Sequence, residues 1–478
     1  MKNEFRPSFG ASLLILGFLV VFMTISVVWL NIPVHIVLLI AAAVAVAVTM
    51  YEGNTWDAIS EAIVYGGELA IAPCIVLYVI GTVMGSWIAS GTVPMIIYWG
   101  LKIISPTVFL VTSCLVCAVT SLATGSSWST GGTVGIALMG IGAGLGINPA
   151  MTAGAIVSGA YVGDKMSPLS DTTNLAPAVA EGDLFDHIKS MMYTTIPGFI
   201  ITLALYGFLG AKYAGQSLNM DAINVTLTAL SENFKLNPIV LIPPVLVITM
   251  AVKKVPALPT LFISSAIASI LAISLQGESI TSITNIMDSG FVSNTGIAEI
   301  DKLLSRGGLQ SMHWTASLGL IGIVYGGILE KSKVLEVFLD RLKVLTRTTG
   351  MLVCTTVFSL IGLNFATASQ YLTIVIGGRM FVSAYKEKDM LPQTLSRTLE
   401  DAGTLTSPLV PWGLCGVFFA GTLGVPTLSY VPYAFLNWIV PVIAIIYGFT
   451  GKFQWKTGEI PSKKTYQDAV AVDNKDSL

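Results

Sequence analysis

A short polar stretch, residues 159–174, stands between apolar sequences and carries three charged side chains close together. They are Asp164, Lys165 and Asp171, with Pro168 between them. At the centre of a bilayer each charged side chain would cost at least ~2.5–3.5 kcal/mol, so a group of three calls for a function. We expect Asp164 and Asp171 to be the ion-coupling carboxylates, and Lys165 to balance their charge when no cation is bound.

The same stretch is dense in oxygen atoms that could hold a small, hard cation such as sodium. Pro168 removes a backbone donor and breaks a helix, which frees main-chain carbonyl groups. Hard cations take oxygen ligands, so we expect sodium as the metal ion, with Asp164 and Asp171 as its carboxylate ligands. The polar side chains expected to bind the ion or a substrate beside them are Ser167, Ser170, Thr172, Thr173 and Asn174. The alternative is an ordinary polar loop outside the membrane.

Two further interruptions of apolar sequence, residues 124–130 and 364–370, are rich in hydroxyl groups and small residues. They could be the tips of re-entrant hairpins that contact the ligand, or sites of close helix packing through small residues. The side chains that would bind there are Thr124, Ser126, Ser127, Asn364, Thr367 and Ser369, joined by Thr406 and Ser407 farther along the chain.

The composition of the 478-residue chain is that of a membrane protein. Hydrophobic residues make up 54% and charged residues 11%, whereas a soluble domain carries about 25% charged residues. The mean hydropathy of +0.77 agrees. The net charge of −2 gives no argument for nucleic-acid binding. The chain contains no P-loop and no hydrolase motif, so we expect neither ATP-driven pumping nor an enzyme, and no cofactor apart from transported or coupling ions.

Apolar runs of about 20 residues predict membrane-spanning helices. The candidates are 11–30, 34–50, 68–90, 107–123, 191–211, 237–251, 257–275, 311–329, 349–363 and 430–449. Other apolar stretches are interrupted by Gly, Ser, Thr and Pro, and no uninterrupted helix fits the middle of 149–180. Backbone breaks at membrane depth are tolerated only where they are buried in protein or line a cavity. The interrupted stretches are therefore the places to look for function.

Three short motifs recur in the same order at nearly one spacing. Ser167-Pro168-Leu169 returns as Ser407-Pro408-Leu409, and a Gly-x-x-x-Gly beginning at Gly81 returns at Gly322. The tips at 124–130 and 364–370 are the third pair. The chain therefore divides into two homologous transmembrane repeats and two polar segments, which are the first repeat 9–211, an extracytoplasmic linker 212–236, the second repeat 237–450 and a cytoplasmic tail 451–478.

The two copies of the Ser-Pro-Leu motif differ in charge. Aligning them places Thr404 where Asp164 stands and Pro411 where Asp171 stands. We therefore expect the ion-coupling carboxylates in the first repeat only.

The basic residues indicate that the two repeats have opposite orientations. Cytoplasmic loops collect Lys and Arg, and Lys2 and Arg6 place the N-terminus inside. The segment after the first Gly-x-x-x-Gly helix holds one base, Lys102, whereas the matching segment of the second repeat, 331–347, holds five. This opposite bias predicts an all-α polytopic membrane protein of two inverted-topology repeats, and the interrupted stretches predict broken helices and re-entrant hairpins within it. Ion sites in such transporters lie near the bilayer midplane where the broken helices meet.

The run from Gly163 to Pro177, GDKMSPLSDTTNLAP, closely resembles the signature of the NhaC-type sodium/proton antiporter family. The resemblance implies exchange of internal sodium for external protons in a bacterial inner (plasma) membrane, with both termini cytoplasmic. It also implies Asp164 and Asp171 as the coupling carboxylates. The same family contains members that exchange malate for lactate with proton and sodium coupling.

These observations favour a secondary active transporter in which sodium and protons compete for a midplane carboxylate site. The alternative is a sodium- and proton-coupled exchanger of small organic acids, and a channel or non-transporting membrane protein is a third class. The expected partners are sodium, protons and the lipid bilayer. A small carboxylate substrate and a homodimer are left open.

Overall fold

The computed structural model describes residues 5–30, 32–213, 220–253, 255–297, 300–301, 304–342 and 346–456. Parts of two predicted segments lie outside these residues, namely 214–219 of the linker and 457–478 of the tail. In the described residues the regular structure is helical apart from one isolated bridge between Met390 and Lys456. The predicted all-α class is confirmed.

The part of the chain up to the linker forms ten helices in its described residues. They are α1 (Phe9–Thr24), α2 (Val34–Tyr51), α3 (Trp56–Ala89), α4 (Thr92–Ile103), α5 (Pro106–Thr124), α6 (Ser127–Thr130), α7 (Ile136–Gly144), α8 (Pro149–Met166), α9 (Asp171–Val179) and α10 (Leu184–Ala211). Two π-helical segments, Ile25–Trp29 and Gly131–Gly135, continue α1 and α6.

The linker contributes α11 (Met220–Asn233), and further helices follow it. They are α12 (Ile242–Val252), α13 (Ala257–Leu271), α14 (Ile280–Ser289), α16 (His313–Lys331), α17 (Val334–Leu342), α18 (Thr349–Thr367), α19 (Gln370–Lys386), α20 (Pro392–Thr398), α21 (Leu414–Leu423), α22 (Thr427–Tyr430) and α23 (Phe435–Thr450). The π-helical segments Ala272–Gln276 and Leu399–Thr404 continue α13 and α20, and short 3₁₀ turns occupy Pro238–Leu241, Leu309–Met312, Ser407–Leu409 and Val431–Tyr433.

Seven helices in the described residues are long and apolar enough to cross a membrane, and counting three bent pairs as single spans gives ten. The seven are Val34–Tyr51, Trp56–Ala89, Pro106–Thr124, Leu184–Ala211, Leu258–Gln276, Leu309–Lys331 and Thr349–Thr367. The bends are 99° between Asn224–Asn233 and Pro238–Met250, 48° between Pro392–Leu409 and Leu414–Leu423, and 57° between Thr427–Tyr433 and Phe435–Thr450. The chain is a multi-pass membrane protein.

Two predicted boundaries need correction. The span predicted at 68–90 begins earlier, at Trp56, because the Thr55 hydroxyl accepts a hydrogen bond from Ala58 N and caps the helix there. At 34 residues, α3 is about 51 Å long at 1.5 Å per residue, well beyond a ~30 Å hydrocarbon core. The span predicted at 430–449 is bent near Ala434, and its straight part begins at Phe435.

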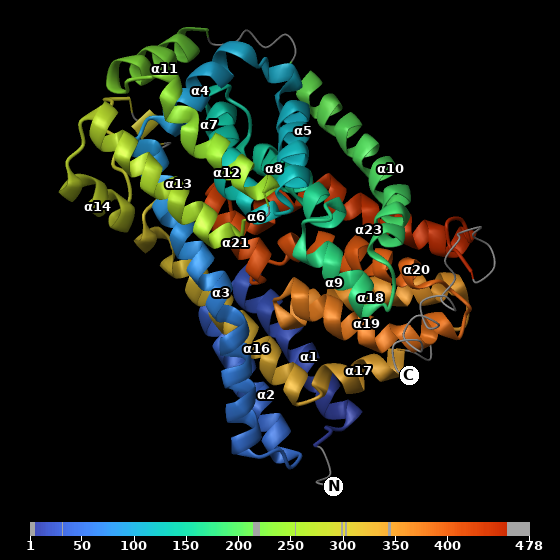
Figure 1. Cartoon of the computed structure of the whole chain (residues 1–478). Helices are drawn as coiled ribbons and strands as arrows, with labels where there is room; N and C mark the ends of the chain where they lie inside the picture. Colours follow the sequence, from blue (N-terminus) through green and yellow to red (C-terminus); the bar gives the residue numbers. More distant parts are fainter. Residues whose placement is uncertain are drawn as a thin grey trace, which may run out of the picture.

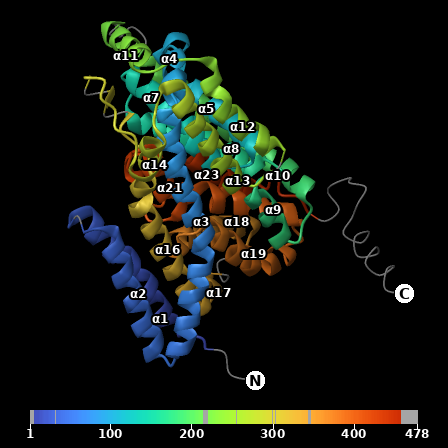
Figure 2. The same ribbon diagram turned by 60° about the vertical axis from the view of Figure 1, so that its left-hand side comes forward.

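The long helix α3 packs along α16, and the two run in opposite directions (Figures 1 and 2). A Cβ added at Gly66 would lie 2.6 Å from Cα of Val324, and one at Gly81 would lie 3.0 Å from Cγ of Met312. The start of α3 therefore meets the end of α16. This direction is what inverted repeats require of two matching helices, while the relation between the complete halves stays a prediction.

The Gly-x-x-x-Gly motifs let α3 and α16 approach other elements of the protein. A Cβ at Gly85 would lie 2.8 Å from the Ile286 carbonyl oxygen, and a Cβ at Gly322 would lie 2.9 Å from Cβ of Ala368. The absence of side chains lets the helices approach closely, and α16 thereby supports the turn between α18 and α19.

In Figure 1, α1, α2 and α17 lie at one end of the molecule, while α4, α11 and α14 lie at the other. The broken helices α8–α9 and α20–α21 lie between these ends, among α5, α10, α18, α19 and α23. Most of the polar stretch that the sequence singles out is thus buried inside the helical bundle, while its depth in the membrane stays a prediction.

Candidate functional site

The helix break expected in 149–180 is present, because α8 ends at Met166 and α9 begins at Asp171. Glycines bring α8 close to α5, since a Cβ at Gly159 would lie 2.8 Å from Cβ of Cys117. The Gly163 amide donates to Ser121 Oγ at 2.9 Å. This close packing places the next residue, Asp164, beside the turn that ends α5.

Asp164 is 7% exposed and is held by hydroxyl groups. Ser127 Oγ donates to Oδ2 at 2.5 Å, and Ser170 Oγ donates to Oδ1 at 3.2 Å. The main-chain carbonyl of Asp164 accepts from Thr172 Oγ1 at 3.0 Å and Thr173 Oγ1 at 2.8 Å. In the described part of the chain no salt bridge reaches this carboxylate. We call Asp164 with these four hydroxyl residues the hydroxyl cage.

The turn between α5 and α6 positions Ser127. Gly125 ends α5 with φ = 69°, and a Cβ there would lie 2.6 Å from the Leu169 carbonyl carbon. This left-handed backbone and close approach favour glycine. Ser126 then caps α6 by accepting from Ser129 N at 3.1 Å. The predicted tip therefore places only Ser127 on Asp164, since Thr124 and Ser126 bond to the local backbone.

Asp171 lies in different surroundings from Asp164. It is the first residue of α9 and is exposed. It interacts with Tyr371 of α19, and its charge is close enough to act on Asp164. The two predicted carboxylates are therefore brought together, but only Asp164 is enclosed.

Two other predicted residues stabilise the helix break. Asn174 Nδ2 donates to the carbonyl oxygens of Pro168 at 2.9 Å and Ser170 at 2.7 Å. Ser167 Oγ donates to the Leu122 carbonyl at 2.9 Å. Their polar atoms are used by the backbone of the break in this structure.

Lys165 points away from Asp164 and forms an ion pair with Asp401 of the second repeat, both side chains being fully buried. Its Nζ also donates to Thr194 Oγ1 at 3.1 Å and Thr195 Oγ1 at 2.7 Å, and Thr194 Oγ1 donates to Asp401 Oδ1 at 2.8 Å. The expectation that Lys165 balances Asp164 and Asp171 is therefore not what this structure contains. Helix periodicity turns adjacent side chains about 100° apart.

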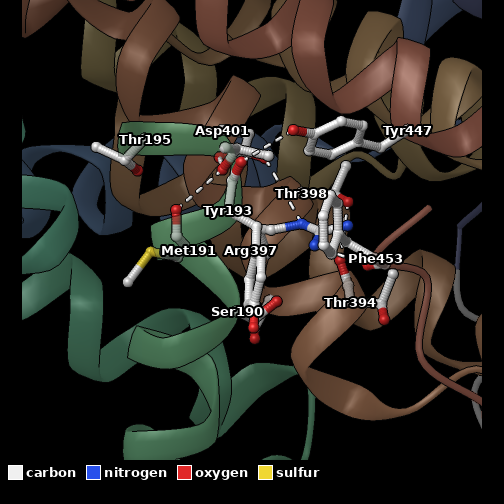
Figure 3. A network of polar contacts seen from close by, with 12 residues as sticks. Ser190, Met191, Tyr193, Thr195, Thr394, Arg397, Thr398, Asp401, Tyr447 and Phe453 are labelled. Atoms are coloured by element: carbon white, nitrogen blue, oxygen red, sulfur yellow. Dashed lines mark hydrogen bonds and ion pairs between the residues drawn. The ribbon is translucent and has the colours of Figure 1, made fainter. Parts of the chain in front are cut away.

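Arg397 also lies beside Asp401 (Figure 3). Its Nε lies 3.9 Å from Asp401 Oδ2, and its Nη1 donates to the Phe453 carbonyl at 2.8 Å. The guanidinium also lies over the Trp455 ring, 5.3 Å from its centroid. We call Lys165, Asp401 and Arg397 the buried ionic network. The segment after α23 folds back to cover it.

The second tip has the same local construction as the first. Ala368 ends α18 with φ = 55°, and Ser369 Oγ caps α19 by accepting from Leu372 N at 3.4 Å. Thr367 Oγ1 donates to the Ser369 carbonyl at 3.1 Å, as Thr124 does to Ser126 in the first tip. This likeness supports the predicted homology of the two halves.

Side-chain contacts across the second tip involve only neutral groups. Asn364 Nδ2 donates to the Gly403 carbonyl at 2.7 Å and to Thr406 Oγ1 at 2.9 Å. Ser407 Oγ donates to Gln370 Oε1 at 2.8 Å.

The two tips contact the broken helices through different side chains. Ser127 follows the first tip and contacts Asp164, while Gln370 follows the second tip and contacts Ser407. One pair of contacts keeps the spacing that Ser-Pro-Leu suggests, since Ser121 accepts from Gly163 and Asn364, which holds the matching place before the second tip, donates to Gly403. The alignment of Thr404 with Asp164 stays a prediction.

Sequence reasoning missed three charged residues of the second repeat. Arg397, Glu400 and Asp401 are each fully buried, although the stretch 393–425 looks apolar as a whole. The available signal was an acidic pair three and four residues after an arginine inside an apolar segment, because charges at membrane depth point to function or pairing. The prediction that coupling carboxylates come from the first repeat alone overlooked this pair.

The chemistry open to the hydroxyl cage is that of a small cation. In the described residues no group of three or more His, Cys, Asp or Glu side chains is arranged to hold a metal ion. A sodium ion transported here would have to be bound by one carboxylate together with hydroxyl and carbonyl oxygens, which the cage supplies and hard cations accept.

Comparison with known proteins gives consistent matches. The sequence model of the "Na+/H+ antiporter family" matches residues 159–452. The chain is 40% identical over 462 residues to a "Na(+)/H(+) antiporter NhaC" of Alkalihalophilus pseudofirmus, covering 96% of this chain and 100% of that protein. It is 35% identical to a "Malate-2H(+)/Na(+)-lactate antiporter" of Bacillus subtilis, covering 96% and 98%. It is 39% identical to an "Arginine/ornithine antiporter ArcD" of Halobacterium salinarum, covering 95% and 93%.

Proposed function

Because the chain belongs to the Na+/H+ antiporter family, we propose that it exchanges sodium for protons at the hydroxyl cage, with Asp164 as the carboxylate that binds sodium. The chain is a transporter and not an enzyme. The observation that carries the proposal is the state of Asp164, a buried carboxylate whose hydrogen bonds come from neutral hydroxyls. An ionised carboxylate that is buried without a positive charge beside it is high in free energy. Asp164 is therefore stabilised by binding either sodium or a proton.

Competition between sodium and protons for one carboxylate site makes the exchange obligatory. Sodium entering the cage replaces a proton on the carboxylate site, and the proton leaves to the side from which sodium came. A proton from the opposite side later displaces sodium there. Neither ion can leave the buried site without being replaced by the other, because an uncompensated charge would remain. The broken helices α8–α9 and α20–α21 are suited to a midplane site of this kind.

The direction and setting of exchange rest on the distribution of basic residues. Lys and Arg gather in segments assigned to the cytoplasm, which supports cytoplasmic termini in a bacterial plasma membrane. In that orientation internal sodium is exchanged for external protons, driven by the proton gradient.

Exchange of small organic acids is the second candidate function. The malate/lactate antiporter among the relatives supports it, as do the neutral amide and hydroxyl groups at the second tip, Asn364, Gln370 and Ser407. The arginine/ornithine relative shows that closely related chains carry names with different organic solutes. A solute would then occupy the two tips, with sodium as the coupling ion.

Proteoliposomes loaded with a pH-sensitive dye test both candidates. Addition of sodium alone should move protons in the wild type, and Asp164→Asn should abolish the signal in protein that still elutes as a folded species. Asp186→Asn is the matched control, because Asp186 is a part-exposed carboxylate in the first turn of α10 that pairs with Lys189. A wild type that is silent until malate, lactate or arginine is added would replace sodium/proton exchange with organic-solute exchange.

A further inference from the structure

Sodium/proton exchange at the hydroxyl cage leaves one buried carboxylate, that of Glu400, without a role. It lies in the π-helical segment Leu399–Thr404 and is fully buried. Neither of its oxygens accepts a hydrogen bond of normal geometry from a described residue. The nearest polar group is the Thr404 hydroxyl, which is itself without a partner of normal geometry. Buried polar groups are otherwise hydrogen-bonded, so this carboxylate needs an explanation.

Glu400 lies close to both the hydroxyl cage and the buried ionic network. It is the chain neighbour of Asp401, whose ion-pair partner Lys165 is the chain neighbour of Asp164, and its segment Leu399–Thr404 packs against α8 and α9. No hydrogen bond joins Glu400 to Asp164, Lys165 or Asp401 within the described residues.

Other ionisable groups also lie on elements packed around Leu399–Thr404. They are Asp164 and Lys165 of α8, Asp171 of α9, Tyr371 and Tyr385 of α19, Arg397 of α20 and Tyr447 of α23, with His187 of α10 facing Lys165 and Arg397. Asp171 is exposed and its charge is open to solvent screening.

The charges that remain enclosed add up to zero only without Glu400. Lys165 and Arg397 carry two positive charges, and Asp401 and Asp164 carry two negative charges, although both bases pair with Asp401 and neither pairs with Asp164 in the described residues. An ionised Glu400 would leave one buried negative charge in excess, which is strongly unfavourable in a dry interior. A sodium ion in the cage would restore neutrality with Glu400 ionised. A proton on Glu400 would restore it with the cage empty.

Hydrogen bonding indicates which carboxylate takes that proton. The ionised form of Asp164 is stabilised by two hydroxyl donors, from Ser127 and Ser170. Glu400 has no such donor. A proton shared by two nearby carboxylates resides mainly on the one whose charged form is less stabilised.

We propose that Glu400 carries the proton that is exchanged for sodium, while Asp164 stays ionised and binds the sodium. The proposal rests on the proposed function and deepens it. When sodium enters the cage, the O–H bond of the Glu400 carboxylic acid breaks and the proton leaves to water on the open side. After sodium departs, a proton from the other side re-forms that bond, so proton and charge balance in each half-cycle.

Calorimetry of sodium binding to the full-length protein in detergent tests this, using buffers that differ in protonation enthalpy. The wild type should release a proton with each sodium bound, and its apparent affinity should change about tenfold per pH unit on the acid side. Glu400→Gln should still bind sodium, with no proton release and a flat pH profile. Asp164→Asn should not bind sodium at all. Glu330→Gln, a part-buried glutamate bonded by Tyr65, is the matched control and should behave as wild type.

The results distinguish failure of sodium/proton exchange itself from failure of the role proposed for Glu400. A wild type that binds no sodium at any pH overturns the proposed function itself. A wild type that binds sodium, together with a Glu400→Gln variant that still releases a proton, overturns only the role of Glu400. If Glu400→Gln does not fold, infrared spectra of Glu400→Asp decide. A carboxylic C=O band that disappears on sodium addition and is shifted from its wild-type frequency supports the role, and an unshifted band overturns it.

Discussion

Asp164 and Lys165 are neighbours in the chain, yet α8 carries them into opposite surroundings. Asp164 faces neutral hydroxyls from α6 and the helix break, with no salt bridge in the described residues. Lys165 faces Asp401 and two threonines of α10, so its charge is fully paired. A paired charge is held in one arrangement, whereas an unpaired carboxylate can accept a cation. The first surroundings therefore suit binding and release, and the second suit a rigid frame.

The largest expected effect comes from removing a charge from the buried ionic network. Lys165→Met leaves Asp401 with only the 3.9 Å contact to Arg397 and should lower the free energy of unfolding by about 3 kcal/mol, measured by denaturation in mixed micelles. Lys189→Met is the control, because Lys189 is exposed and its bridge to Asp186 is 3.7 Å long. Equal effects of the two substitutions would show that the ion pair contributes no stability.

A double variant separates the two roles that Lys165 could have. Lys165→Met with Asp401→Asn removes both charges of the short ion pair and should recover part of the lost stability, because Arg397 then keeps its charge without Asp401. If sodium/proton exchange also returns, Lys165 is a structural residue. If stability returns without exchange, Lys165 takes part in ion coupling as the sequence suggested.

The next effect concerns the hydroxyl cage. Ser127→Ala removes a hydrogen bond to a charged group, worth about 1.5–3 kcal/mol, and should weaken apparent sodium affinity about tenfold or more. The physical reason is that the cage loses one of the hydroxyl oxygens proposed to bind sodium beside Asp164. Sodium-concentration dependence of proton flux measures the change. Ser269→Ala is the control, since its hydroxyl donates to the Ser265 carbonyl of its own helix, and a matching loss there would remove the special role of the cage.

The smallest effect is expected at Asp171. Its exposed charge is worth about 1 kcal/mol or less to a nearby ion, so Asp171→Asn should change sodium affinity about fivefold or less. The sequence alone gives Asp171 and Asp164 the same rank. Abolished flux in Asp171→Asn, at normal expression and folding, would mean that Asp171 becomes a ligand in another conformation of the transport cycle.

Much of the fold could be predicted because hydrophobicity is a local property of the chain. Runs of apolar residues gave most spanning helices, and Pro168 with its polar neighbours located the break between α8 and α9. The predicted helix boundaries are wrong where a cap or a bend, and not the apolar run, sets the end of a helix. Thr55 starts α3 before its apolar run, and a bend at Ala434 divides an apolar segment that reads as continuous.

The candidate site was half predictable. The charged and hydroxyl residues of the first repeat lie within a few positions of one another, so the sequence identified Asp164, Ser170, Thr172 and Thr173 together. The second repeat places Arg397, Glu400 and Asp401 in a long apolar stretch, where averaging over the segment hides them. The role of these three residues depends on the side chains that contact them from other helices, and spacing along the chain does not reveal those contacts.

Side-chain type and order were enough to show that this chain crosses a membrane many times, that its helices break at polar stretches, and that its signature is that of the sodium/proton antiporters. The pairing of Lys165 with Asp401, and not with its neighbour Asp164, became visible only in three dimensions. The same is true of the buried Glu400 carboxylate, which has no hydrogen-bond partner among the described residues. The physical reason is that the energy of a buried charge depends on the groups around it in space, and α8 turns adjacent residues toward different helices.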